Sequence, residues 1–316
     1  MKKTDVTALG EILIDMTYAG KSENGQTLFE QNPGGAPANV LAALSKLGKK
    51  TAFIGKVGKD MHGTFLRETI KKYGIDDSNL ITTEEAFTTL AFVSLSESGE
   101  RSFSFARNPG ADIMLKESEV NRDLIKNSSV FHFGSLSLTH EPARTATFSA
   151  LKCAKENHVI VSYDPNYRAM LWDNEEKAMQ GMRSLLAFVD IIKISDEETE
   201  LVAGEKSPEE AIDRLLNEGI SCVIVTMGAK GAMVGINEGK VFKEAVPGTK
   251  VVDTTGAGDA FMGGFLYKLC ENNLHPENLT LENISEFCEF ANKVASRCVE
   301  KRGGINAMPT ITELDA

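Results

Sequence analysis

Short β-branched apolar runs alternate with longer helix-like segments along most of this chain, and this alternation restricts the fold more than any other feature. The candidate strands are Val6–Met16, Thr51–Val57, Ser129–Phe133, Val159–Asp164, Ile191–Ile194, Cys222–Thr226 and Ala232–Val234. The helix-like segments lie near residues 36–48, 60–74, 142–157, 175–188, 208–218 and 259–272. Such alternation predicts βαβ units, and therefore an α/β fold with a doubly wound, mainly parallel sheet flanked by helices. With no long linker in the chain, we expect a single domain over residues 1–316.

Two segments depart from the strand–helix alternation. Residues 12–31 alternate around polar turns, and residues 87–107 form two alternating runs joined by Glu97-Ser98-Gly99-Glu100, which predicts a hairpin. Together they could make a small β-sheet that covers a site as a lid and excludes water from it. The alternative is an ordinary hairpin at a sheet edge.

Composition limits the partners of this protein. The 34 basic and 45 acidic residues give a net charge of −11, which disfavours nucleic acid and anionic membranes because no basic run is present. No apolar run approaches the ~20 residues of a membrane span. Glu11 and Asp15 interrupt any signal-peptide core. Five scattered cysteines without metal-ligand spacing fit a reducing cytoplasm.

The segment Asp253-Thr254-Thr255-Gly256-Ala257-Gly258-Asp259-Ala260-Phe261 predicts a phosphate site. A small-residue turn before a helix directs backbone N–H groups and the positive end of the helix dipole at one point. A carboxylate beside a phosphate makes sense if Asp259 accepts a proton from an attacking hydroxyl, and the dipole should lower its pKa. The alternative is a Gly-rich turn with a first-turn acid. Neither a dinucleotide fingerprint nor a P-loop fits these residues.

A second glycine cluster, Pro33-Gly34-Gly35-Ala36-Pro37-Ala38-Asn39-Val40, precedes a predicted helix. Two glycines allow close approach of backbone to a ligand, and Asn39 offers both a donor and an acceptor to a hydroxyl. Asn39 could instead be a buried polar residue at the start of the helix.

The two clusters together resemble the PfkB, or ribokinase-like, family of carbohydrate kinases. The C-terminal signature is matched from Asp253 to Leu266, and the N-terminal one by Gly34, Gly35, Asn39, Gly48 and Gly58. Segments similar to those of the fructose-phosphorylating members are Gly10–Asp15, Gly34–Asn39, Gly99–Asp112 and Tyr163–Trp172. The resemblance implies a ribokinase-like fold and an ATP-dependent kinase that converts D-fructose to fructose 6-phosphate. Other sugar or nucleoside specificities, such as 2-keto-3-deoxygluconate or ribose, and an inactive sugar sensor are the alternatives.

The resemblance also implies roles for individual residues. Asp259 would be the catalytic base, and Gly256, Ala257 and Gly258 the anion hole. The residues that would bind the sugar are Asp15, Gly34, Gly35, Asn39, Phe103, Phe105, Arg107 and Arg168. Those that would bind the nucleotide are Ser195, Thr226, Gly228, Gly231 and Asn292.

Metal ions and a partner subunit are implied as well. The resemblance implies that Glu198 binds Mg²⁺ through a water molecule. Ser195 occupies the position at which the family has Asn. Asp253 and Thr255 fit a loop that holds a monovalent cation such as K⁺ in the family. An exposed sheet edge favours pairing, which suggests a homodimer through the lid as one arrangement, with a monomer as the alternative.

Overall fold

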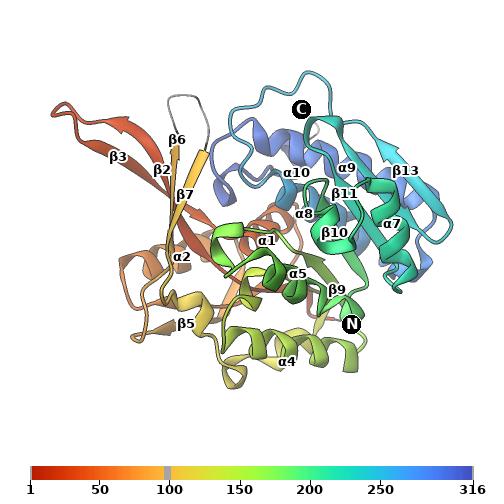
Figure 1. Ribbon diagram of the computed structural model, residues 1–316, viewed down its shortest axis with the longest axis horizontal. Coiled ribbons are helices and arrows are strands. Elements are labelled where there is room, and N and C mark those ends of the chain that lie inside the picture. Colours follow the sequence, from red (N-terminus) through yellow and green to blue (C-terminus); the bar gives the residue numbers. More distant parts are fainter. Residues whose placement is uncertain (1, 96–100, 315–316) are drawn as a thin grey trace.

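The computed structural model describes residues 2–95 and 101–314 and contains two β-sheets (Figure 1). The large sheet has nine strands in the order β13-β12-β11-β10-β9-β8-β1-β4-β5. Their bounds are β1 (Thr4–Leu9), β4 (Thr51–Gly58), β5 (Asp76–Thr83), β8 (Ser128–Gly134), β9 (Ile160–Asp164), β10 (Ile191–Ser195), β11 (Cys222–Thr226), β12 (Ala232–Ile236) and β13 (Gly239–Lys243). The strands from β11 to β5 lie parallel, whereas β12 and β13 are antiparallel additions at one edge. This arrangement confirms the predicted doubly wound, mainly parallel sheet.

One predicted strand is wrong in its extent. The run Val6–Met16 divides between the two sheets, because β1 ends at Leu9 and β2 (Leu13–Lys21) begins in the small sheet. Both halves of the run are apolar and buried near the junction, so hydrophobicity alone does not reveal where the chain passes from one sheet to the other.

Helices cover both faces of the large sheet. One face packs against α1 (Ala36–Lys46), α2 (Met61–Lys72), α8 (Ala257–Glu271), α9 (Leu281–Val299) and the short α10 (Ile311–Leu314). The other packs against α3 (Arg122–Lys126), α4 (Ala143–Glu156), α5 (Glu175–Arg183), α6 (Thr199–Ala203) and α7 (Pro208–Asn217). No described helix is both long and apolar enough to cross a membrane.

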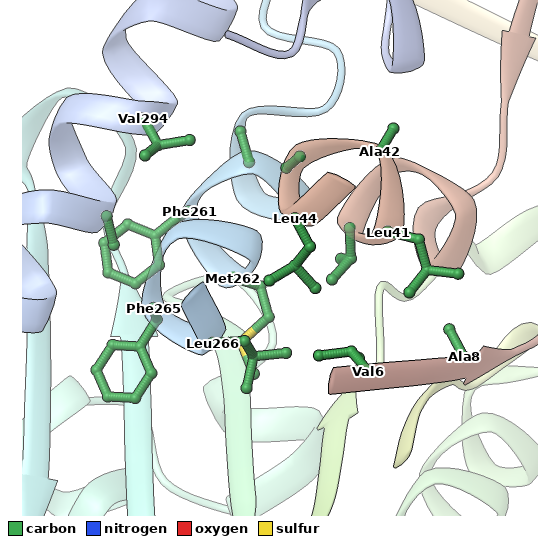
Figure 2. Close-up of a cluster of buried hydrophobic side chains, with 14 of the residues drawn as sticks. Val6, Ala8, Leu41, Ala42, Leu44, Phe261, Met262, Phe265, Leu266 and Val294 are labelled. Carbon is green, nitrogen blue, oxygen red and sulfur yellow. The ribbon is translucent and has the colours of Figure 1, made fainter. Parts of the chain in front are cut away.

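Helix α8 carries the glycine signature and lies between α1 and α9. Figure 2 shows Leu44 of α1 and Met262 and Leu266 of α8 grouped near Val6 of β1. A Cβ atom on Gly263 would lie 2.6 Å from Ala43 Cβ, and one on Gly264 would lie 2.9 Å from Val294 Cγ2. These glycines therefore allow the close helix packing that fixes where α8 begins.

The small sheet projects from one side of the body (Figure 1). It has the order β3-β2-β6-β7, with β3 (Thr27–Gly34), β6 (Leu90–Leu95) and β7 (Arg101–Ala106) beside β2. β2 pairs antiparallel with β3 and parallel with β6, and β6 and β7 form the predicted hairpin. The connecting residues 96–100 lie outside the described residues. The predicted small sheet is present, and its action as a lid stays a prediction.

Candidate active site

A cavity of about 400 Å³ opens where the small sheet meets the carboxyl ends of the parallel strands. Ligand sites of open α/β sheets characteristically lie at this edge. Predicted site residues from the small sheet, from α1 and α8 and from connecting segments line it together: Asp15, Gly35, Asn39, Phe105, Arg168, Asp253, Thr255, Gly256, Ala257, Gly258 and Asp259. The two glycine clusters, more than 200 residues apart in the chain, therefore contribute to one site.

Asp259 lies in the first turn of α8 and is 5% exposed. The Asn39 amide donates a 2.7 Å hydrogen bond to Asp259 Oδ2, and the Asn166 amide lies 3.4 Å from Oδ1. Asn166 has a φ of 47°, a left-handed conformation that asparagine tolerates better than most residues. Each carboxylate oxygen of Asp259 thus faces an amide donor, which fixes the orientation of the carboxylate.

The turn before α8 has the geometry expected of an anion site. Gly256 caps the helix with a φ of 78°, a conformation that favours glycine. The Ala257 N–H donates to Thr254 O at 3.2 Å within this turn. The first N–H groups of a helix lack partners within the helix, so those of Gly258 and Asp259 fall at the positive end of the α8 dipole.

The expectation that the dipole lowers the pKa of Asp259 is wrong. Burial raises the pKa of Asp259 to about 6, and the nearby Asp164 carboxylate raises it further, whereas Lys193, Asn39 and Arg168 oppose the rise. Desolvation disfavours the charged form of a carboxyl, and here it outweighs the local donors. A carboxyl with this pKa is largely ionised at neutral pH and can accept a proton.

The sugar-side residues of the prediction converge around Asp15. Burial raises the pKa of Asp15 to about 7, while Arg168 opposes the rise. A Cβ atom on Gly34 would lie 2.1 Å from Asp15 Oδ2, so the absence of a side chain at 34 makes room for this carboxylate. Gly35 has a φ of 111°, and a Cβ there would lie 2.5 Å from Glu11 O. Both glycines are therefore required by the packing around the cavity.

Arg107 does not join this group, which corrects the prediction that it faces the substrate. Its buried guanidinium makes a 2.6 Å ion pair with Asp112 and also donates to Leu136 O and Thr139 Oγ1. Asp112 Oδ1 in turn accepts from Thr89 at 2.6 Å. These contacts clamp the base of the β6–β7 hairpin behind Leu136, which lines the cavity, whereas Arg107 itself does not. Phe105 does line the cavity, and the side chain of Phe103 lies outside the described part of the chain.

The predicted nucleotide residues lie beyond the cavity, along the neighbouring strand ends. Ser195 and Thr226 are register partners at the carboxyl ends of β10 and β11. Gly228 and Gly231 follow in a short turn with φ values of 53° and 115°. A Cβ on Gly231 would lie 2.1 Å from Lys243 O, so this turn packs directly on the end of β13.

Asn292, on α9, contacts the same corner. Its amide donates to Lys243 O and Glu244 O at 3.2 and 3.0 Å. In the structure it holds the chain leaving β13, and its contact with a nucleotide stays a prediction.

The predicted metal residues are tied to backbone groups. Glu198 is buried, and its two oxygens accept from the N–H groups of Tyr167 and Ser195 at 2.6 and 2.8 Å. Among the described residues no group of three or more His, Cys, Asp or Glu side chains could hold a metal ion. A Mg²⁺ ion that keeps its waters and binds phosphate needs only one or two protein carboxylates, so this arrangement still fits one.

Asp253 joins two loops beside the anion turn. Its Oδ1 accepts from the N–H and hydroxyl of Thr255, and its Oδ2 accepts from Gly303 N at 3.0 Å. A Cβ on Gly256 would lie 3.2 Å from Gly304 Cα, so the two loops pack closely. The two loops expected to hold a monovalent cation therefore lie side by side, and the cation itself stays a prediction.

Comparison with known proteins decides the family. The model of the pfkB family of carbohydrate kinases matches residues 3–311. This chain belongs to the PfkB family.

Individual PfkB relatives resemble it over nearly the whole length. The "probable fructokinase-5" of Arabidopsis thaliana is 44% identical over 312 residues, covering 96% of this chain and 94% of the relative. The fructokinase of Xylella fastidiosa, solved with bound ATP, has a TM-score of 0.89 and 32% identity over 99% of this chain and 97% of that chain. The fructokinase of Vibrio cholerae O395, solved with fructose, ADP and a calcium ion, has the same TM-score and identity over 99% and 98%. The predicted family and the ribokinase-like fold are thereby confirmed.

The cavity of this PfkB protein also contains residues that the sequence prediction missed. Glu11, Asn166 and Lys193 are buried or partly buried residues of its lining. Glu11 Oε1 accepts from Ala36 N at 2.9 Å, its Oε2 has no partner within the described chain, and burial raises its pKa to about 7. For Glu11 and Lys193 the available signal was a charged residue beside or within an apolar run, since a buried charge requires a partner or a function.

Proposed function

We propose that this chain is an ATP-dependent fructokinase that phosphorylates the primary hydroxyl of D-fructose to give fructose 6-phosphate and ADP. The observation that carries the proposal is the placement of Asp259: an oriented, buried carboxylate at the glycine start of α8, inside a cavity of about 400 Å³. The similarity to fructokinases from a plant and two bacteria supports fructose as the substrate.

Asp259 acts as the general base in this proposal. The sugar oxygen forms a bond to the terminal phosphorus of ATP as the bond from that phosphorus to the ADP oxygen breaks, and the hydroxyl proton passes to Asp259. Phosphoryl transfer has a loose transition state, so the proton moves late and the carboxylate chiefly aims the hydroxyl. Asn39 and Asn166 hold the carboxylate in that orientation.

The turn at Gly256–Gly258 stabilises the transferring group. Its backbone and the helix dipole are fixed before the reaction, so they need no reorganisation as charge spreads over the phosphoryl oxygens. In this proposal Asp15, Gly35 and Asn39 bind sugar hydroxyls, and Phe105 packs against the apolar face of the sugar; these residues line the same cavity.

We further propose that Glu198 holds Mg²⁺ through water and that the loops joined by Asp253 and Thr255 hold a monovalent cation such as K⁺. When bound, Mg²⁺ supplies charge neutralisation to the ATP phosphates. Ser195, Thr226, Gly228, Gly231 and Asn292 would line the nucleotide. The single-domain arrangement with the small sheet as a lid belongs to the same proposal.

Two further features of the proposal concern the protein in the cell. β3 is an edge of the small sheet, with Leu28 and Phe29 45% and 39% exposed, which favours a homodimer through the lid. The cytoplasm is the proposed location of the protein, because free cysteines persist in a reducing compartment. Light scattering at several concentrations tests the dimer, and a monomer at all of them would contradict it.

An ADP-release assay over fructose, glucose, ribose, 2-keto-3-deoxygluconate and a nucleoside tests the activity. We expect the highest kcat/KM with fructose. A higher value with another sugar would replace the substrate but keep the kinase, whereas no turnover with any of them would favour the sugar sensor.

The role of Asp259 has its own test. Asp259→Asn should bind fructose and ATP normally and lower kcat by about 10²–10⁴-fold. Asp112→Asn, which removes a buried carboxylate that does not line the cavity, is the control; it should lose stability because Arg107 is left without its charged partner, but it should retain kcat. Near-normal turnover by Asp259→Asn would remove this residue from the mechanism.

A further inference from the structure

Lys193 is a buried cation in a strand of the large sheet. It lies on β10, its side chain is 7% exposed, and its Nζ makes a 2.7 Å ion pair with Oδ2 of Asp164 at the end of β9. Burying an ion pair costs desolvation that the pair itself often fails to recover. A buried lysine at the edge of a ligand cavity therefore requires an explanation beyond stability.

The ammonium lies against the start of α8. A Cβ atom on Gly258 would be 2.7 Å from Lys193 Nζ and 3.5 Å from Cε, so the lysine occupies the space that a side chain at 258 would fill. Lys193, Gly256, Gly258 and Asp259 line the same cavity. The positive charge thus sits at the turn whose backbone forms the anion site.

Lys193 keeps its charge there. Burial alone would lower the pKa of Lys193, but Asp164, Glu198 and Asp259 more than offset it and raise the pKa above the usual value. Within the described chain the ammonium makes a hydrogen bond to Asp164, and an ammonium has three donors. Donor capacity therefore remains for an anion in the cavity.

We propose that Lys193 is a catalytic residue that directs a fixed positive charge at the phosphoryl group during transfer, with Asp164 as the residue that positions it. This inference rests on the proposed kinase function. In the loose transition state, negative charge is distributed over the three equatorial oxygens of the transferring phosphoryl group differently than in bound ATP. A preorganised cation beside those oxygens therefore stabilises the transition state more than it stabilises the complex with bound substrates. The same position explains why residue 258 is glycine.

A structural role makes a different prediction. If Lys193 only neutralised Asp164 and Asp259, its loss would lower thermal stability and raise the pKa of Asp259, with little change in kcat once Asp259 is ionised. Measurements at alkaline pH, where Asp259 is ionised in every variant, separate the two roles.

The experiment compares Lys193→Met with Lys56→Met in the full chain. Lys56 is the matched control because it is also buried, forms a 2.7 Å ion pair with Glu119 and lies outside the cavity lining. For each protein we would measure the kcat plateau at alkaline pH, the Kd of fructose, and the Kd of ADP with aluminium fluoride in the presence of fructose, which mimics the transferring phosphoryl group.

We expect Lys193→Met to lose about 10²–10³-fold in kcat, as for removal of other preorganised donors, with a parallel loss of affinity for the aluminium fluoride complex. The fructose Kd should change by less than about threefold, because the residues proposed to bind the sugar, Asp15, Gly35 and Asn39, form no hydrogen bond or ion pair with Lys193 within the described chain. Lys56→Met should lose stability and keep both its kcat and its affinity for the mimic. If Lys193→Met does not fold, Lys193→Gln replaces it in the experiment, because its amide retains a donor for Asp164. The same losses of kcat and of affinity for the mimic are expected of Lys193→Gln.

A kcat within about threefold of wild type for either Lys193 variant would overturn the inference, as would a lower kcat with unchanged affinity for the mimic. The wild-type protein is assayed first. Absence of wild-type turnover with every sugar would overturn the proposed function and this inference together, whereas active wild type and active variants would overturn the inference alone.

Discussion

Replacing Asn39 by alanine should shift the pH at which the enzyme loses activity in acid. Asn39 donates a 2.7 Å hydrogen bond to Asp259 Oδ2, and this bond lowers the pKa of Asp259 against the larger effect of burial. The bond stabilises the charged carboxylate, so its removal raises the pKa. A general base works only when ionised, and the acid limb of kcat/KM should therefore move to higher pH.

The size of the shift follows from the energy of the bond. Hydrogen bonds to charged groups contribute about 1.5–3 kcal/mol, and one pKa unit corresponds to about 1.4 kcal/mol. The pKa of Asp259 should therefore rise by about 1–2 units from its value of about 6. Asp259 is only 5% exposed, which limits how far water can replace the lost amide.

The assay is kcat/KM for fructose at saturating MgATP between pH 5 and 9. Any effect of the bound nucleotide on the pKa of Asp259 is present in both the variant and the wild type, so it cancels in the comparison. Asn79→Ala is the control, since Asn79 is a buried asparagine that bonds Glu119 O and Asn121 N away from the cavity, and its acid limb should match that of wild type. A uniform loss of activity in Asn39→Ala with no movement of the limb would refute this account of Asp259.

Three further substitutions test other parts of the structure. Gly34→Ala should raise KM for fructose about tenfold or more and leave KM for ATP unchanged, because the new Cβ would lie 2.1 Å from Asp15 Oδ2. Equal effects on the two KM values would contradict this. Arg107→Met leaves Asp112 without its charged partner and should lower the unfolding free energy by about 3–5 kcal/mol in denaturant titrations. KM for fructose should stay near the wild-type value, and a large increase in KM would return Arg107 to the sugar site. Burial raises the pKa of Glu11 from 4.5 in the unfolded chain to about 7 in the folded protein, so the wild type loses folding free energy as pH rises through that range. Glu11→Gln has no such loss, and its stability relative to wild type should increase between pH 5 and 8 by up to about 3 kcal/mol. A stability difference that does not depend on pH would contradict this.

The sequence predicted the central strands better than the edge strands for a physical reason. Strands such as β9 and β10 are covered on both faces, so all residues of β9 and all but the last of β10 are buried, and the apolar runs Ile160-Val161 and Ile191-Ile192 mark them. β5 and β13 lie at the two edges of the large sheet, where exposed positions carry polar residues, and neither was among the predicted strands. The division of Val6–Met16 between two sheets depends on tertiary packing that a local pattern does not contain.

The same distinction between local and distant effects applies to the site. The glycines at 34, 35 and 256 could be predicted because backbone conformation and close approach leave a local signature. The pKa of Asp259 could not, because it is raised first by burial under segments distant in the chain and then by Asp164, at a strand end 95 residues away. Lys193 escaped prediction because a single lysine in an apolar run does not show which residue it will face.

The two sheets contribute different parts of the proposed reaction, and this division can be argued from the cavity itself. Asp15 and Phe105 come from the small sheet, whereas Asp259 and Lys193 come from α8 and the large sheet. Interactions made equally with substrate and transition state change KM, and those made only with the transition state change kcat. Substitutions on the small sheet should therefore act mainly on KM for fructose, and those around the start of α8 mainly on kcat. Asn39 bridges the two groups, because it lies on the helix that follows β3 and bonds Asp259 directly.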